Sequence, residues 1–77
     1  MTVTIYSTTW CHFCKEAKKF FTENNVKFKE INVEEDQEAA REMVEKSGQM
    51  GVPVIDIDGT IIVGFDRTKI KKALKMP

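Results

Sequence analysis

Apolar residues in the first half of the chain change their spacing twice. Residues 3 to 7 alternate apolar with polar side chains, which is typical of a short strand. Residues 11 to 24 have the spacing of an amphipathic helix, with one apolar face formed by Phe13, Ala17, Phe20 and Phe21. Apolar positions between residues 26 and 33 then mark a second strand. The first half therefore predicts a β-α-β unit, whose two strands are expected to run parallel.

The second half of the chain predicts one helix, a hairpin and a final helix. Acidic residues from Glu34 to Glu38 fall where a helix would begin, and Gly48 follows its expected end. Two apolar runs, residues 52 to 57 and 61 to 65, are joined through Asp58-Gly59, a strong hairpin signal. Asp66 is suited to cap the last helix. The predicted order is β-α-β-α-β-β-α, an α/β arrangement.

Length and composition restrict the chain to one small domain. Its 77 residues leave no room for a second core, so residues 1–77 are expected to form a single domain. The chain is expected to act as a monomer. Twelve acidic residues balance twelve basic ones, which gives no indication of a nucleic-acid partner or an anionic membrane. No signal peptide and no apolar run of transmembrane length is visible. These features favour a cytoplasmic protein.

The chemistry of the sequence is concentrated in the only two cysteines, Cys11 and Cys14, with His12 between them. Zinc sites need about four ligands, and these three residues are the whole complement of Cys and His. A structural disulfide is a poor alternative, because bridging residues three apart closes a very short loop and stabilises little. An iron–sulfur cluster shared by two copies of the chain is an open alternative, in which each copy would supply two thiolates, or one thiolate together with an external thiol.

A reversible redox function fits the position of the cysteines better. Cys11 falls where the first strand gives way to the first helix, and the unpaired N–H groups of a helix start stabilise a thiolate. Cys14 follows one turn later, close enough to resolve a mixed disulfide formed at Cys11. A C-x-x-C motif in a cytosolic β-α-β context is one of the more specific short redox signals. We therefore expect a thiol–disulfide oxidoreductase that needs no metal and no organic cofactor.

The chain also resembles the glutaredoxin family of the thioredoxin fold along its whole length. The segments that carry the resemblance are WCHFC at 10–14, INV at 31–33, SGQMGVPVI at 47–55 and DGTIIVGFD at 58–66. The resemblance implies a four-stranded mixed sheet flanked by three helices. It also implies that Cys11 is an exposed nucleophile, that Cys14 is the more buried resolving thiol, and that a cis Val52-Pro53 peptide faces them. The positions expected to contact substrate are Trp10, His12, Phe13, Val52, Pro53, Gly64 and Asp66.

Several departures from the family pattern bear on the reductant. Thr8 stands where glutaredoxins usually carry a lysine, and Met50 stands where they carry an arginine. The lost groups neutralise glutathione carboxylates in the family, so glutathione would bind weakly as a co-substrate unless Lys15 or Lys46 replaced them. The same pattern resembles the glutaredoxin-like hydrogen donors of ribonucleotide reductase, which depend on thioredoxin reductase. The expected substrates are disulfides in proteins or in small molecules, with disulfide-containing proteins as the expected partners, and the reductant is either glutathione or a thioredoxin reductase-type enzyme.

Two residues of the motif have competing interpretations. A protonated His12 imidazole next to Cys11 would stabilise its thiolate and make the disulfide more oxidising; alternatively His12 fills a variable surface position. Lys15, one turn beyond Cys11, is a second candidate for holding the thiolate. Asp66 is suited both to grip the amino group of a ligand and to cap the last helix.

Overall fold

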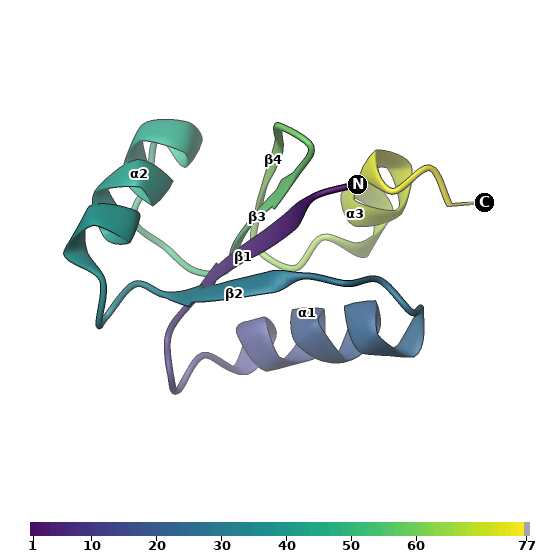
Figure 1. Cartoon of the computed structure of the whole chain (residues 1–77), viewed down its shortest axis with the longest axis horizontal. Coiled ribbons are helices and arrows are strands. Elements are labelled where there is room, and N and C mark those ends of the chain that lie inside the picture. Colours follow the sequence, from purple (N-terminus) through teal and green to yellow (C-terminus); the bar gives the residue numbers. More distant parts are fainter. Residues whose placement is uncertain (77) are drawn as a thin grey trace.

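The computed structural model describes residues 1–76, which form a four-stranded sheet and three helices (Figure 1). The elements in chain order are β1 (Val3–Ser7), α1 (His12–Glu23), β2 (Lys29–Asn32), α2 (Gln37–Ser47), β3 (Val54–Ile57), β4 (Thr60–Val63) and α3 (Arg67–Ala73). The order of elements is the predicted β-α-β-α-β-β-α, and the thioredoxin-like architecture is confirmed. No helix within the described residues is long and apolar enough to cross a membrane.

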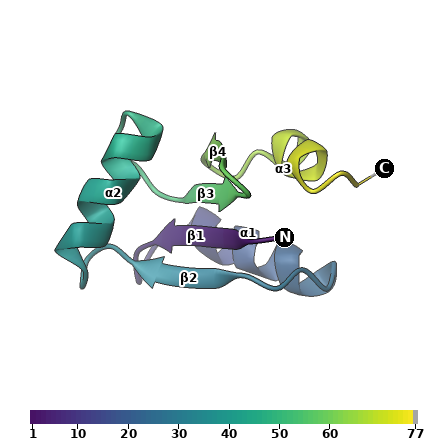
Figure 2. The ribbon, with the colours of Figure 1, turned by 45° about the horizontal axis from the view of Figure 1, so that its top comes forward.

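The sheet is mixed, with the strands in the order β2-β1-β3-β4. β1 pairs in parallel with β2 and antiparallel with β3, while β3 and β4 form the predicted antiparallel hairpin. Asp58 and Gly59 both have positive φ, 48° and 94°, as a two-residue hairpin turn requires. Figure 2 shows β3, β1 and β2 side by side, with the start of β3 beside the end of β1.

Helices cover both faces of the sheet, so alternate residues of the central strands are buried on opposite sides. Helices α1 and α3 cover the face that carries Ile5 and Ile55, whereas α2 covers the face that carries Tyr6 and Val54. The two apolar clusters explain why Tyr6, which alternates with the apolar positions of β1, is nevertheless 1% exposed. Both faces of the central strands are therefore buried.

Several boundaries of the expected strands were wrong: β3 begins at Val54 and not at residue 52, β4 ends at Val63 and not at residue 65, and the largest difference is at the start of β2. The second strand was expected from residue 26, but β2 begins at Lys29. Asn25 has a φ of 57°, and the Val26 N–H donates to the Phe21 carbonyl at 2.8 Å. The backbone before β2 therefore still forms hydrogen bonds with the end of α1. The pairing of β2 with β1 begins only at Lys29, which lies opposite Thr4. The apolar side chains of Val26 and Phe28 still pack against the core.

Candidate active site

Cys11 ends the loop that connects β1 to α1 and is the N-cap residue of that helix. Its backbone is extended, with φ −79° and ψ 114°, and its sulfur accepts a hydrogen bond from the Cys14 N–H at 3.2 Å. A helix N-terminus presents unpaired N–H groups and positive partial charge, and both favour a thiolate over a thiol. The fold therefore places the sulfur of Cys11 where negative charge is stabilised.

Cys14 lies one turn into α1 and has a different environment. Its side chain is completely buried, whereas Cys11 is 9% exposed. Burial, followed by the hydrogen bond with Cys11, raises the pKa of the Cys14 thiol to about 12. The prediction of an exposed Cys11 was wrong, because this residue is also buried. The expected difference in accessibility between the two sulfurs is nevertheless present.

Pro53 lies at the same end of the sheet as the cysteine loop. Tyr6 of β1 pairs with Val54 of β3, so Pro53 comes just before the strand that adjoins the end of β1. The Val52-Pro53 peptide is cis, as the resemblance implied, with Val52 half-buried and Pro53 buried. The Gly64 N–H donates to the Pro53 carbonyl at 2.8 Å. This bond joins two of the expected substrate-binding positions, Pro53 and Gly64.

Large apolar side chains are exposed on the segments that meet at this end of the sheet. Trp10, which is 75% exposed, and Phe13 flank Cys11 in the chain. Met50 lies on the segment that leads to Pro53, and Val63 immediately precedes Gly64; both are exposed. We call these four residues the apolar rim. A set of exposed apolar side chains near a reactive group favours contact with another protein or peptide.

The two candidate thiolate-tuning residues are exposed on α1. The His12 imidazole lies 3.6 Å from a carboxylate oxygen of Glu16, one turn along the helix, and packs edge-on against Phe13. Lys15 donates its backbone N–H to the Cys11 carbonyl at 3.3 Å, and its side chain is exposed. The contacts of the His12 ring are thus with Glu16 and Phe13, and the tuning of Cys11 by His12 or Lys15 stays a prediction.

The ammonium group of Lys46 already contacts three other side chains. Its ammonium donates to the Tyr6 hydroxyl at 3.0 Å and to Asp56 at 2.9 Å. A third contact, 3.0 Å long, joins it to Glu42. These contacts raise the pKa of Lys46, with the hydrogen bond to Tyr6 as the largest cause. The replacement of a missing glutathione contact by Lys46 would require breaking this network.

Asp66 caps α3, as expected from the sequence. Its carboxylate accepts a hydrogen bond from the Lys69 N–H at 3.1 Å. The backbone of Asp66 is extended, with φ −101° and ψ 97°, which is the usual conformation of an N-cap residue. Its second expected role, as a contact for the amino group of a ligand, stays a prediction.

Sequence reasoning missed the role of Glu34. It was expected at the start of a helix, but the N-cap of α2 is Asp36 and Glu34 lies in the preceding loop. There its carboxylate accepts hydrogen bonds from the Thr9 N–H and from the indole N–H of Trp10. The two contacts join residues 25 and 24 positions apart, so no local pattern indicates them. Thr8 was considered only as the replacement of a lysine, but its hydroxyl oxygen is buried and has no hydrogen-bond partner within residues 1–76.

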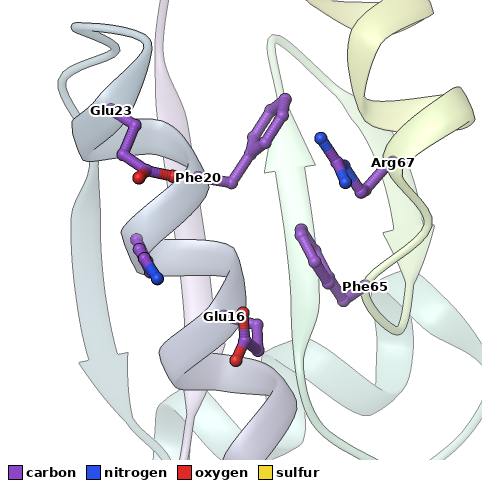
Figure 3. Close-up of a pocket in the computed structure, with 6 residues that line it drawn as sticks. Glu16, Phe20, Glu23, Phe65 and Arg67 are labelled. Carbon is purple, nitrogen blue, oxygen red and sulfur yellow. The ribbon is translucent and has the colours of Figure 1, made fainter.

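A small cavity lies beside α1, away from both cysteines. Its volume is about 110 Å³, and it is lined by Glu16, Lys19, Phe20, Glu23, Phe65 and Arg67. Figure 3 shows Phe20 and Phe65 facing one another with Arg67 close by. The two rings are 6.0 Å apart, and the Arg67 guanidinium lies 5.4 Å from the Phe20 ring centre. This cavity contains neither sulfur.

Potential metal ligands are also sparse. Within residues 1–76, no group of three or more His, Cys, Asp or Glu side chains is arranged to hold a metal ion. The iron–sulfur alternative concerns a cluster shared by two copies of the chain, so it stays a prediction.

The fold and the paired cysteines define a thioredoxin-like redox protein. The sequence profile of the Glutaredoxin family matches residues 3–62. A glutaredoxin-like 8.6 kDa protein in the rubredoxin operon of Clostridium pasteurianum is 44% identical over 73 residues, which cover 95% of this chain and 97% of the relative. The glutaredoxin-like protein NrdH of Lactococcus lactis is 36% identical over 70 residues, or 91% of this chain and 96% of that protein.

A solved structure supports the same assignment. The glutaredoxin-like protein NrdH-redoxin from Escherichia coli, described as having a thioredoxin-like activity profile, superposes with a TM-score of 0.85 at 28% identity. The superposition covers 94% of this chain and 93% of that one. The chain belongs to the glutaredoxin family, and it is a thiol–disulfide oxidoreductase.

Proposed function

We propose that this protein reduces disulfide bonds in other proteins by a dithiol route, with Cys11 as nucleophile and Cys14 as resolving thiol. The observation that carries the proposal is the contrast between the two sulfurs. Cys11 is 9% exposed and caps a helix, whereas Cys14 is completely buried and burial raises its pKa to about 12. At neutral pH this contrast favours attack by Cys11, since thiolates and not thiols are nucleophiles.

The reaction needs only these two sulfurs and a disulfide substrate. The Cys11 thiolate attacks one substrate sulfur, a mixed disulfide forms, and the other substrate sulfur leaves as a thiolate that takes a proton from water. Cys14 then loses its proton and attacks the Cys11 sulfur, which releases the second substrate thiol. The substrate disulfide gains two electrons and two protons, and the Cys11–Cys14 disulfide forms. No metal or organic cofactor takes part in these steps.

The apolar rim supports a protein substrate. The rim residues Trp10, Phe13, Met50 and Val63 offer aromatic and aliphatic surface to the segment that carries the disulfide. Exposed aromatic residues are common anchors of protein–protein contacts. The backbone near Pro53 can add strand-like hydrogen bonds to an extended peptide, as in other cases of strand addition. Both features suit a polypeptide better than a small charged disulfide.

The reductant in this proposal is a thioredoxin reductase-type enzyme. Thr8 and Met50 replace the basic residues that the glutaredoxin pattern supplies for glutathione. Lys46 is held by Tyr6 and Asp56. Hydrogen bonds to charged groups are worth about 1.5–3 kcal/mol each, so the loss of two such contacts weakens glutathione binding substantially. The thioredoxin-like activity profile described for the Escherichia coli NrdH-redoxin agrees with this assignment. A reducing cytoplasm is the compartment that suits such a cycle.

A comparison of reductants tests the proposal. The oxidised protein is mixed either with NADPH and a thioredoxin reductase or with glutathione, glutathione reductase and NADPH, with insulin as the disulfide substrate. We expect rapid insulin reduction with the first system and little with the second. The opposite result would mean that other residues replace the missing glutathione contacts. An absorbance spectrum of anaerobically purified protein addresses the iron–sulfur alternative, which visible absorbance in stoichiometric yield would support.

A further inference from the structure

Glu34 makes two hydrogen bonds to the segment that immediately precedes Cys11. One carboxylate oxygen accepts from the Thr9 N–H at 2.7 Å, and the other accepts from the indole N–H of Trp10 at 3.3 Å. The two donors belong to consecutive residues, so one carboxylate holds a backbone group and the neighbouring side chain together. Glu34 lies in the loop between β2 and α2, whereas Thr9 and Trp10 lie in the loop between β1 and α1.

The loop that carries Glu34 is itself held in place. The Val33 N–H donates to the Ser7 carbonyl at 2.9 Å, which extends the pairing of β1 and β2 by one bond. The side chain of Asn32 accepts from the Glu34 N–H at 2.9 Å and donates to the Thr9 hydroxyl at 3.0 Å. The carboxylate of Glu34 is therefore presented by a braced loop rather than by a freely moving one.

The indole of Trp10 depends on this carboxylate for its orientation. With 75% of the residue exposed, neighbouring side chains offer little packing to restrict the ring. A charge-assisted hydrogen bond is directional and selects one arrangement of the side chain. The ring is thus held beside Cys11 before any substrate arrives.

We propose that Glu34 is a positioning residue for protein substrates, because it fixes the Trp10 indole and the Thr9 backbone next to Cys11. This inference rests on the proposed reduction of protein disulfides. Ordering a large side chain on binding costs free energy, and a ring that is already oriented avoids that cost. Glu34 then lowers the KM for a protein disulfide and leaves the chemistry of the two sulfurs unchanged. A small disulfide that does not reach the indole gains nothing from it.

Glu34→Gln is the informative variant, with Glu35→Gln as its matched control. The glutamine amide keeps one acceptor oxygen but turns the other into an NH₂ donor, so it cannot accept from both Thr9 and Trp10. Glu35 is exposed on the same loop, and within residues 1–76 its carboxylate has no hydrogen bond or ion pair. The two variants therefore remove the same charge from the same loop, and only one of them removes the contact.

Two measurements test the inference. Trp10 is the only tryptophan, so the time-resolved fluorescence anisotropy of the reduced protein reports the motion of its ring. Steady-state reduction of insulin and of hydroxyethyl disulfide, with dithiothreitol as reductant, separates a protein substrate from a small one. For Glu34→Gln we expect faster motion of the indole, a KM for insulin raised by about two- to tenfold, and an unchanged kcat. The rate with hydroxyethyl disulfide should equal that of the parent, and Glu35→Gln should match the parent throughout.

Each other outcome has a definite meaning. Equal anisotropy and equal KM in Glu34→Gln and the parent would overturn the inference. An equal loss of rate with both disulfides would also overturn it, because Glu34 would then act on the cysteines and not on substrate contact. If the parent reduced neither disulfide, the proposed function would fail, while the anisotropy would still decide whether Glu34 holds the indole.

Discussion

The difference between Cys11 and Cys14 can be measured directly by alkylation. At pH 8 a thiol with the ordinary pKa of 9.0 is about 10% ionised, whereas one with a pKa of about 12 is about 0.01% ionised. The fraction of reactive thiolate at Cys14 is therefore about a thousandfold smaller. A more basic thiolate is intrinsically more nucleophilic, which recovers a factor of about 15–30 over this range. The net expectation is alkylation slower than that of an ordinary cysteine by about 30- to 60-fold, and burial of the sulfur slows it further.

The assay is a time course with iodoacetamide on the reduced protein between pH 7 and pH 10. Fragmentation of the peptide that holds both cysteines assigns each modification to Cys11 or Cys14 by mass. We expect Cys11 to react first, and Cys14 to react slowly with a rate that rises about tenfold for each pH unit, since pH 10 is still below its pKa. In urea both cysteines should react at similar rates. A Cys14 rate that levels off below pH 10, or that comes within tenfold of a model cysteine peptide, would refute the reasoning.

Three further predictions follow from the contacts of individual side chains. Proline suits the first position of a helix, so His12→Pro should keep α1 and lower the reduction potential by tens of millivolts. Glu16→Gln should raise the reduction potential, because it removes the carboxylate that contacts the His12 imidazole. Equal reduction potentials in the parent and both variants would contradict thiolate tuning by His12. Asp66→Ala removes the cap of α3 and should lower the free energy of unfolding by about 1 kcal/mol, seen as a fall in Tm of about 4–8 °C. Phe21→Ala, at a fully buried site, should cost about 3–5 kcal/mol in urea unfolding, whereas Phe13→Ala, on the apolar rim, should change stability by less than about 0.5 kcal/mol.

Local chemistry explains why most of the fold was predictable. The Asp58-Gly59 turn, the cap at Asp66 and the left-handed Gly48 at the end of α2 each depend on neighbouring residues, and the structure contains all three. The start of β2 was not predictable in the same way. It depends on where β1 offers a partner, which is a property of the assembled sheet.

The candidate site likewise has features that neighbouring residues predict and features that depend on the assembled fold. The positions of Cys11 and Cys14 at a helix start follow from a strand-to-helix change that the spacing of apolar residues indicates. The contact of Glu34 with Trp10 and the network around Lys46 join residues distant in sequence, so only the fold brings them together. The nearly complete burial of Cys11 is likewise a property of the assembled fold.

Trapping of the mixed disulfide tests the central claim most directly. Cys14→Ser removes the resolving thiol and leaves Cys11, so incubation with a disulfide-containing peptide should give a stable adduct of one peptide chain on Cys11, visible by mass spectrometry and released by dithiothreitol. Cys11→Ser should give little such adduct at neutral pH, because the remaining thiol at Cys14 is buried and its burial, the largest cause of its raised pKa, persists in this variant. An adduct that forms on Cys14 in Cys11→Ser as readily as on Cys11 in Cys14→Ser would contradict the assignment of nucleophile and resolving thiol.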